Sequence, residues 1–418
     1  MFTSAFRVGS VLALTVTAAC TQAPQPDGRA RDPGTARFGQ EDTAGGTSLE
    51  AGGQTGTASV ASVADDTTNQ ALAAGIPLVL DGPPYAVAKT AGSVYIGGTF
   101  RYVGPITGGG VVANAATGAL DSARTPRIPG TVRAAVADAS GRVFVGGTFD
   151  TVGDLPRRNL ARLGPNGQVD AAWKADVAGL VYALALHGDI LVVGGLFTAI
   201  AGVTRQNLAA VRIDSGEVLP WTTPAQARVL QMAIAGGLVY LLGNFTTVGG
   251  EPRSGLAAID PSTGALSEWA SGLDLPEGER RSLAACGDTL LVGGGEATLG
   301  SATTKGKISA LSANDASQRW TVYTEHANAF TAAPRSINSI VALGGTAYVS
   351  GVFEEIGGLA RLSQAALECQ TGAILPWSPS VLGTILAAHE QTVYVSPILG
   401  VGGGIVARYN DGSRTPGV

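Results

Sequence analysis

The chain has 418 residues, of which 60 are glycine, and only 14% are charged, where about 25% is usual in soluble domains. This balance favours many tight turns and few helices. The net charge of -5 at pH 7 argues against a nucleic-acid binder, because such proteins carry a basic stripe or patch.

The first 20 residues have the form of a bacterial export signal. Arg7 precedes an apolar run, Val8–Ala19, that is too short to span a bilayer as a helix of the mature protein. The run ends in Thr-Ala-Ala-Cys, which resembles the lipobox of bacterial lipoproteins, although Thr17 stands where leucine is usual. The resemblance implies that Cys20 is lipidated and anchors the chain at the outer membrane or cell surface. The alternative is an ordinary signal peptide cut near Ala19, with Cys20 incidental.

Residues 21–70 are rich in Pro, Gly, Thr, Ala and Gln and contain almost no large apolar side chains. Such a segment cannot bury enough apolar surface to offset the entropy that ordering removes. We expect a disordered tether, spanning on the order of 40 Å, that holds the folded part, residues 71–418, away from the lipid. No later apolar run reaches the roughly eighteen residues that a transmembrane helix needs.

Four phenylalanines mark a repeat: Phe149, Phe197, Phe245 and Phe353. Glycine precedes each of them, and an arginine and a tryptophan follow at fixed distances. These residues are Arg157, Arg205, Arg253 and Arg361, then Trp173, Trp221, Trp269 and Trp377. Trp320 obeys the same spacing if Glu296 holds the phenylalanine position of a diverged copy. All five tryptophans then share one position, so the chain is a tandem repeat.

Each copy predicts four short strands. In the copy around Phe197, alternating apolar runs at 181–186 and 190–197 flank a turn, and two further runs end at Trp221. Period-two runs bounded by Gly, Asp, Asn and Ser are typical of hairpin strands, and four strands in about 40 to 50 residues are typical of a β-propeller blade. Seven repeat markers predict seven blades: Phe100, Phe149, Phe197, Phe245, Glu296, Phe353 and Leu399.

The last copy lacks its fourth strand, because Val418 comes before the position where that strand is expected. Near the other end, Ile76-Pro77-Leu78 resembles Leu375-Pro376-Trp377 and stands at a matching distance before the next marker. We therefore predict an all-β, seven-bladed β-propeller in which residues 75–80 complete the last blade. This closure would leave no sheet edge unpaired.

The repeat resembles the tandem β-propeller repeat of bacterial exported proteins, the delta-sixty type. The pattern G-x-F-T-x-x-G-G-x-x-R-x-x-L-A-R-L is matched best from Gly147 to Gly167 and from Gly243 to Gly264. The first, fifth and seventh copies depart from it. The resemblance implies a propeller over residues 75–418 and implies no activity.

Residues that recur in nearly every copy are expected to hold the blades together, because a single site on a closed ring does not need symmetric copies. The phenylalanines and tryptophans should pack between sheets, and the arginines should donate hydrogen bonds to loop carbonyls. The alternative is that the arginines ring one face and bind an anionic ligand.

Binding residues are expected where the repeat is broken. The connection from Trp320 to Phe353 is nine residues longer than its equivalents, which places an insertion within Thr321–Ser336. The neighbouring copy has Glu296 in place of phenylalanine. Loops on a rigid scaffold commonly carry binding residues; the alternative is drift in a tolerant loop. The candidate binding residues are Glu296, Lys305, Lys307, Tyr323, Glu325, His326 and Arg335.

The cysteines and histidines do not indicate a site. Cys286 and Cys369 fall in different blades and on different turns, so we expect no disulfide between them. His187 and His389 share one repeat position with Cys286, but their blades are not neighbours, so they cannot all reach one metal ion. No metal, cofactor or catalytic residue is assigned, since the sequence lacks nucleophile-elbow, zinc-protease and phosphate-loop motifs.

The sequence favours a monomeric, non-catalytic propeller that binds a protein or glycan of the envelope and touches the membrane only through its lipid anchor. The alternative is an exported hydrolase or lyase that uses acidic groups such as Glu296 and Glu325 at the channel mouth. A purely structural envelope component is a third class.

Overall fold

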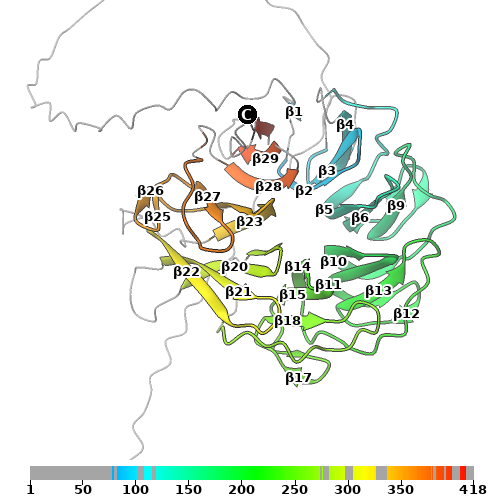
Figure 1. The fold of residues 1–418 in the computed structure, drawn as a ribbon. Coiled ribbons are helices and arrows are strands. Elements are labelled where there is room, and N and C mark those ends of the chain that lie inside the picture. The colour runs from blue at the N-terminus through cyan, green and yellow to red at the C-terminus, as the bar shows by residue number, and fades with distance from the viewer. Residues whose placement is uncertain are drawn as a thin grey trace, which may run out of the picture. The chain divides into compact units, whose positions relative to one another are not determined.

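The computed structural model (Figure 1) describes residues 78–79, 82–101, 108–114, 119–273, 275, 282–296, 305–325, 337–377, 379, 383–389, 392–397 and 405–410. These residues belong to one compact unit, Ala64–Val418. The expected signal with Cys20, the tether at 21–70, His326 and Arg335 lie outside the described residues. Within the described ranges all regular structure is β, and no helix is long and apolar enough to cross a membrane.

The alternating apolar runs form antiparallel hairpins. β10 (Val177–His187) and β11 (Ile190–Ile200) pair across a turn at Gly188, whose φ of 59° suits glycine because it lacks a Cβ. β13 (Leu208–Arg212) pairs with the other side of β11. The first six residues of β11 are all buried, because this central strand is covered on both faces.

The same meander recurs along the chain, and each sheet is named by its first strand. The β2 sheet consists of β2 (Pro84–Lys89), β3 (Ser93–Gly98) and β4 (Gly110–Asn114). The β5 sheet consists of β5 (Gly130–Ala137), β6 (Val143–Phe149) and β9 (Leu160–Leu163), followed by a ribbon of β7 (Thr151–Val152) and β8 (Leu155–Pro156). The β10 sheet adds β12 (Val203–Thr204) at the end of β11.

The later sheets follow the same order. The β14 sheet consists of β14 (Val229–Ala235), β15 (Leu238–Gly243) and β18 (Leu256–Ile259), with a ribbon of β16 (Thr247–Val248) and β17 (Glu251–Pro252). The β19 sheet consists of β19 (Ser282–Cys286), β20 (Thr289–Glu296), β21 (Lys305–Ser312), β22 (Gln318–Glu325), β25 (Glu355–Ile356) and β26 (Leu359–Ala360). The β23 sheet consists of β23 (Ile337–Leu343), β24 (Thr346–Gly351) and β27 (Gln364–Glu368). The β28 sheet consists of β28 (Gly383–His389), β29 (Thr392–Pro397), β30 (Ile405–Asn410) and β1 (Leu78–Val79).

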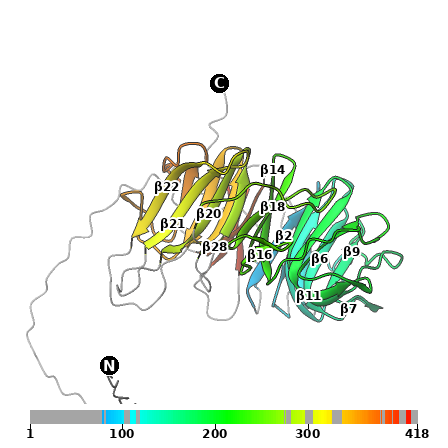
Figure 2. The same cartoon turned by 90° about the horizontal axis from the view of Figure 1, so that it is seen from below.

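The hydrophobic core lies between successive sheets, which stand side by side in Figure 2. Phe144 and Leu160 of the β5 sheet, for example, pack in one cluster with Val181 and Phe197 of the β10 sheet. Burying one such side chain contributes about 1.5–3 kcal/mol. Each first strand contacts the first strand of the next sheet, and β28 also contacts β2.

The N-terminal strand pairs with the C-terminal one. Leu78 is opposite Val406 and Val79 is opposite Ile405, in antiparallel register. β1 therefore occupies the outer edge of the β28 sheet, beside β30, which is the pairing expected for residues 75–80.

The repeated arginines hold each repeat together through their own carbonyl partners, as predicted. Each donates from Nη1 to the carbonyl of the preceding residue and from Nη2 to the carbonyl fourteen residues later. Arg253, for instance, donates to Pro252 O at 2.8 Å and to Ser267 O at 3.0 Å. The guanidinium thus ties the loop after the second strand to the fourth-strand segment. With both Nη groups used in this way, the anion-ring alternative loses its donors.

The repeated tryptophans connect one sheet to the next. Trp269 Nε1 donates to Ser312 O at 3.0 Å, and Trp320 Nε1 donates to Cys369 O at 3.0 Å, each across a sheet junction. Trp173 and Trp221 are almost fully buried. A Cβ at Gly264, whose φ is 74°, would lie 2.4 Å from Trp221 Cγ, so this turn needs glycine both for its backbone and for the tryptophan. The phenylalanines are buried as well.

The expectation that Cys286 and Cys369 remain unpaired is wrong. They form a disulfide that joins the β19 sheet to the segment after β27 in the β23 sheet. In an antiparallel meander the turn between strands one and two and the turn between strands three and four lie at the same end. Two different turns of neighbouring sheets therefore meet, and both cysteines are buried in the core that these sheets share.

Candidate functional site

The diverged repeat extends its sheet where the other repeats form a loop. In the β10 sheet, pairing between β11 and β13 ends at Gly194 and Leu208. In the β19 sheet, pairing between β20 and β21 continues until Glu296 is opposite Lys305. The structure therefore brings these two candidate residues together in register, although their side chains lie outside the described ones.

The outer strand of this sheet carries the described part of the predicted insertion. Lys307 on β21 is directly opposite Tyr323 on β22. Facing residues on paired strands point to the same side of a sheet, with Cβ atoms roughly 5 Å apart. Lys307 is half-buried, and the Tyr323 side chain is 41% exposed, so the pair presents an aromatic ring and an amine on one surface.

The end of β22 continues into the hairpin of the next repeat. Glu325 is opposite Glu355 on β25, Glu354 N donates to Glu325 O at 2.9 Å, and Gly357 N donates to Tyr323 O at 3.0 Å. This link makes the β19 sheet six-stranded and fixes the backbone of Tyr323 and Glu325 to two repeats. We define Lys307, Tyr323 and Glu325 as the β21–β22 surface.

Two small residues allow this extension. A Cβ at Gly306 would lie 2.2 Å from Thr324 Oγ1, so the Lys-Gly-Lys segment can pair with β22 only because its middle residue is glycine. Thr324 itself is buried, whereas Tyr323 and Glu325 on either side of it are exposed. The strand alternation therefore directs both candidate side chains outward.

Two asparagines in the regular repeats were not singled out by the sequence. Asn159 Oδ1 accepts from Phe149 N at 2.9 Å, and its Nδ2 donates to Val177 O at 3.1 Å in the next sheet. Asn207 makes the same contacts with Phe197 N and Ala225 O. Both have φ of 63°, a left-handed conformation that asparagine tolerates better than most residues. The signal was an Asn before Leu-Ala, which only two copies carry.

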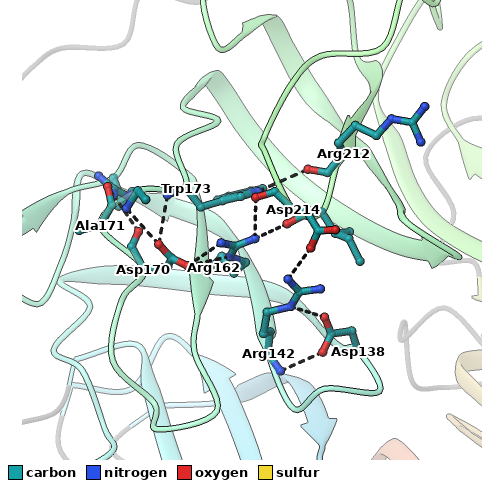
Figure 3. A network of polar contacts seen from close by, with 11 residues as sticks. Asp138, Arg142, Arg162, Asp170, Ala171, Trp173, Arg212 and Asp214 are labelled. Atoms are coloured by element: carbon teal, nitrogen blue, oxygen red, sulfur yellow. Dashed lines mark hydrogen bonds and ion pairs between the residues drawn. The ribbon is translucent and has the colours of Figure 1, made fainter.

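A network of charged residues joins the β5 and β10 sheets at the end opposite the β21–β22 surface (Figure 3). Arg162 contacts Asp170 Oδ2 at 2.5 Å and donates to the carbonyls of Ile213 and Asp214, which lie in the β10 repeat. Arg142 bridges Asp138 and Asp214, each at 2.6 Å. The network is structural, because its hydrogen bonds connect two sheets and reach no opening.

The pKa values of these carboxyls are lowered. The hydrogen bonds from Arg162 hold the pKa of Asp170 below its ordinary value. Burial raises the pKa of Asp138, but hydrogen bonds from Ser140 and Arg142 outweigh burial and lower it. Arg319 and Gln370 hold the pKa of Asp288 far below its usual range. A general acid needs the opposite shift, so these described carboxyls do not fit that role.

An open pocket of about 420 Å³ lies between the β5 and β10 sheets. Its polar rim includes Asp150 and Arg158, both exposed. Gly130 on β5 and Leu180 on β10 also line it. The sequence did not indicate this pocket, because its residues come from two regular repeats. Among the described residues, no group of three or more His, Cys, Asp or Glu side chains could hold a metal ion.

Comparisons with known proteins agree with the architecture. A family described as a beta-propeller domain of unknown function (DUF5122) matches residues 139–172, which span the β6 to β9 segment. The chain is an all-β protein with a propeller-like fold. No curated protein matches it significantly.

Two solved structures are similar to the chain at low identity. The computationally designed Ika8 protein is 13% identical, with a TM-score of 0.49, over 80% of this chain and 99% of that one. A chain described as the extracellular domain of a proposed one component system, BT4673 of B. thetaiotaomicron, is 12% identical with a TM-score of 0.47. That match covers 79% of this chain and only 39% of the other.

Proposed function

We propose that the chain is a seven-bladed β-propeller, closed by β1 and carried by a lipid anchor on the outside of a bacterial membrane. Each sheet named above is one blade, and the tandem repeat is of the delta-sixty type. The pairing of β1 with β30 and the contact of β28 with β2 support closure. Tyr394 of the β28 sheet also packs with Phe100 of the β2 sheet. Deleting residues 71–82 should sharply lower the melting temperature, and an unchanged value would contradict closure.

The anchor and the location rest on two independent observations. Thr17-Ala18-Ala19-Cys20 resembles a lipobox, and the disulfide between Cys286 and Cys369 suits an oxidising compartment. Replacing Cys20 with Ala should move the protein from the membrane fraction to the soluble fraction. Membrane association that survives this change would contradict the lipid anchor.

The propeller is a non-catalytic scaffold that binds an envelope protein or glycan through the β21–β22 surface. The observation that carries this proposal is the extension of the β19 sheet, which fixes Tyr323 and Lys307 as an opposed pair with the ring exposed. The recurring Arg and Trp side chains are used internally, whereas this pair occurs at the diverged repeat. Exposed aromatic residues on a rigid backbone lose little entropy on binding.

The test is affinity capture from cross-linked envelopes with the full lipoprotein and with a Tyr323→Ala, Lys307→Ala double variant. We expect the double variant to lose a partner that the parent protein retains, by about tenfold or more. The matched control is Leu196→Ala, since Leu196 is an exposed apolar residue on β11 of a regular repeat.

Equal capture by the parent and the double variant would contradict binding at this surface. Loss of the partner from the Leu196→Ala control as well would also contradict it, because the effect would then not be local.

A further inference from the structure

A β-bulge recurs in the first strand of the described repeats. The register shifts by one residue between Pro84 and Ala86, between Val132 and Ala134, and between Val181 and Ala183. The same shift occurs in β14, β23 and β28. The residues left unpaired by these shifts are Tyr85, Arg133, Tyr182, Leu230, Asn338 and Leu386. A bulge re-aims the extra side chain away from the pleated ladder.

The first strands lie innermost among the described sheets, with β4, β9 and β13 farther out (Figure 1). β5 contacts both β2 and β10, so the bulge residues of three consecutive sheets meet. The Arg133 guanidinium carbon lies 5.6 Å from the centre of the Tyr85 ring and 5.3 Å from the centre of the Tyr182 ring. Both distances are within the range of cation–π attraction.

Arg133 differs from the repeated arginines in its hydrogen bonds. Each repeated arginine donates to backbone carbonyls, whereas the described residues provide Arg133 with neither a carboxylate nor a carbonyl partner. Its Nε is buried without a hydrogen-bond acceptor. A guanidinium offers five N–H donors in a planar fork that matches an oxyanion. Tyrosine rings screen the positive charge but cannot accept these hydrogen bonds as an oxyanion does.

The surroundings have room for more than an ion. Gly130 and Leu180 line the pocket of about 420 Å³, three residues before Arg133 on β5 and two residues before Tyr182 on β10. Tyr85 is 44% exposed, so part of its ring is open to contact. Pockets from roughly 300 Å³ upward accommodate small organic ligands.

We propose that Tyr85, Arg133 and Tyr182 form a binding site for an acidic saccharide, in which Arg133 receives the oxyanion. The trio occurs in one arc of the first strands, since the corresponding positions on β14, β23 and β28 carry Leu, Asn and Leu. This site lies on different sheets from the β21–β22 surface, so either assignment can fail without the other.

The test is calorimetric titration of the full-length protein with D-glucuronate, D-glucose and inorganic phosphate. We expect saturable binding of glucuronate with a Kd of ~1 mM or tighter, no binding of glucose, and weaker binding of phosphate. Arg133→Gln should weaken glucuronate binding by about 10- to 100-fold, the range for a hydrogen bond to a charged group. Glucuronate and phosphate binding with equal affinity would overturn the requirement for a sugar.

The control is Arg228→Gln, because Arg228 is an exposed arginine immediately before β14. It should leave the glucuronate affinity unchanged. If Arg133→Gln does not fold, Tyr85→Ala serves instead, since Tyr85 is exposed and should weaken binding by about threefold or more. No saturable binding of glucuronate to the parent protein, or equal affinity in folded Arg133→Gln, would overturn the site.

Discussion

The junction between the β5 and β10 sheets and the junction between the β19 and β23 sheets occupy the same end of the repeat, yet their chemistry differs. At the first, Arg162 and Arg142 connect three aspartates across the sheets. At the second, a disulfide joins Cys286 to Cys369, and Arg319 donates to Asp288 and Gln370 beside it. The geometry of facing turns is the same in both, so the sequence can place either ions or a covalent bond there.

The difference has a consequence for stability. Charges at the first junction respond to pH and salt, whereas the covalent bond at the second responds to the redox state. The second junction also borders the extended β22, which carries the β21–β22 surface. A covalent bond there would keep two blades in fixed relation while their opposite ends contact a partner.

The largest effect is expected from removing the disulfide. It closes a loop with a sequence separation of 83, and the loop-entropy estimate for such a length is about 4–5 kcal/mol. Cys286→Ser with Cys369→Ser should lower the free energy of unfolding by about that amount in denaturant titrations. Dithiothreitol should destabilise the parent protein to a similar degree and leave the double variant unchanged. An unchanged parent protein under reduction would contradict the bond.

A smaller effect is expected from opening the charged junction. Arg162→Gln removes the contacts with Asp170, Ile213 O and Asp214 O, and hydrogen bonds to charged groups contribute about 1.5–3 kcal/mol. We expect a loss near the lower end, because Asp170 is 29% exposed and gains solvent. Thermal unfolding should show this loss in reduced and oxidised protein alike. A loss that vanishes after reduction would mean that the two junctions are coupled.

Acid should weaken the charged junction selectively. The folded-state pKa values of Asp138 and Asp170 are lowered, whereas an unfolded aspartate has a pKa of about 3.9. Their stabilising contribution is therefore complete above the unfolded pKa and is lost as the pH falls through the folded pKa values. The melting temperature should fall steadily from about pH 5 to pH 2. Arg162→Gln should show a shallower fall, and an identical slope would contradict the role of Arg162.

The smallest effect is expected from Asp214→Asn. Asp214 is 76% exposed where it pairs with Arg142, and exposed ion pairs contribute about 0–1 kcal/mol. The melting temperature should change by less than in Arg162→Gln, and 1 M salt should remove most of the difference because it screens exposed charges. A larger loss than that of Arg162→Gln would reverse the order of the two contacts.

Most of the architecture follows from patterns that lie within single repeats. The period-two runs, the turn glycines and the spacing from Phe197 to Trp221 predicted the strands, the carbonyl partners of the arginines and the burial of the tryptophans. The candidate residues of the broken repeat were found by the same method. The sequence placed Lys307, Tyr323 and Glu325 in one region, but it predicted a loop for a segment that extends a sheet.

The sequence alone determined what one repeat contains, because strand alternation and short-range spacing are local properties of the chain. The tertiary structure decided what lies between repeats: the disulfide between Cys286 and Cys369, the asparagine contacts across sheets, and Arg133 between Tyr85 and Tyr182. Each of these depends on which turn or strand of one sheet faces the next. That relation is set by packing across the junction, and no spacing along the chain records it.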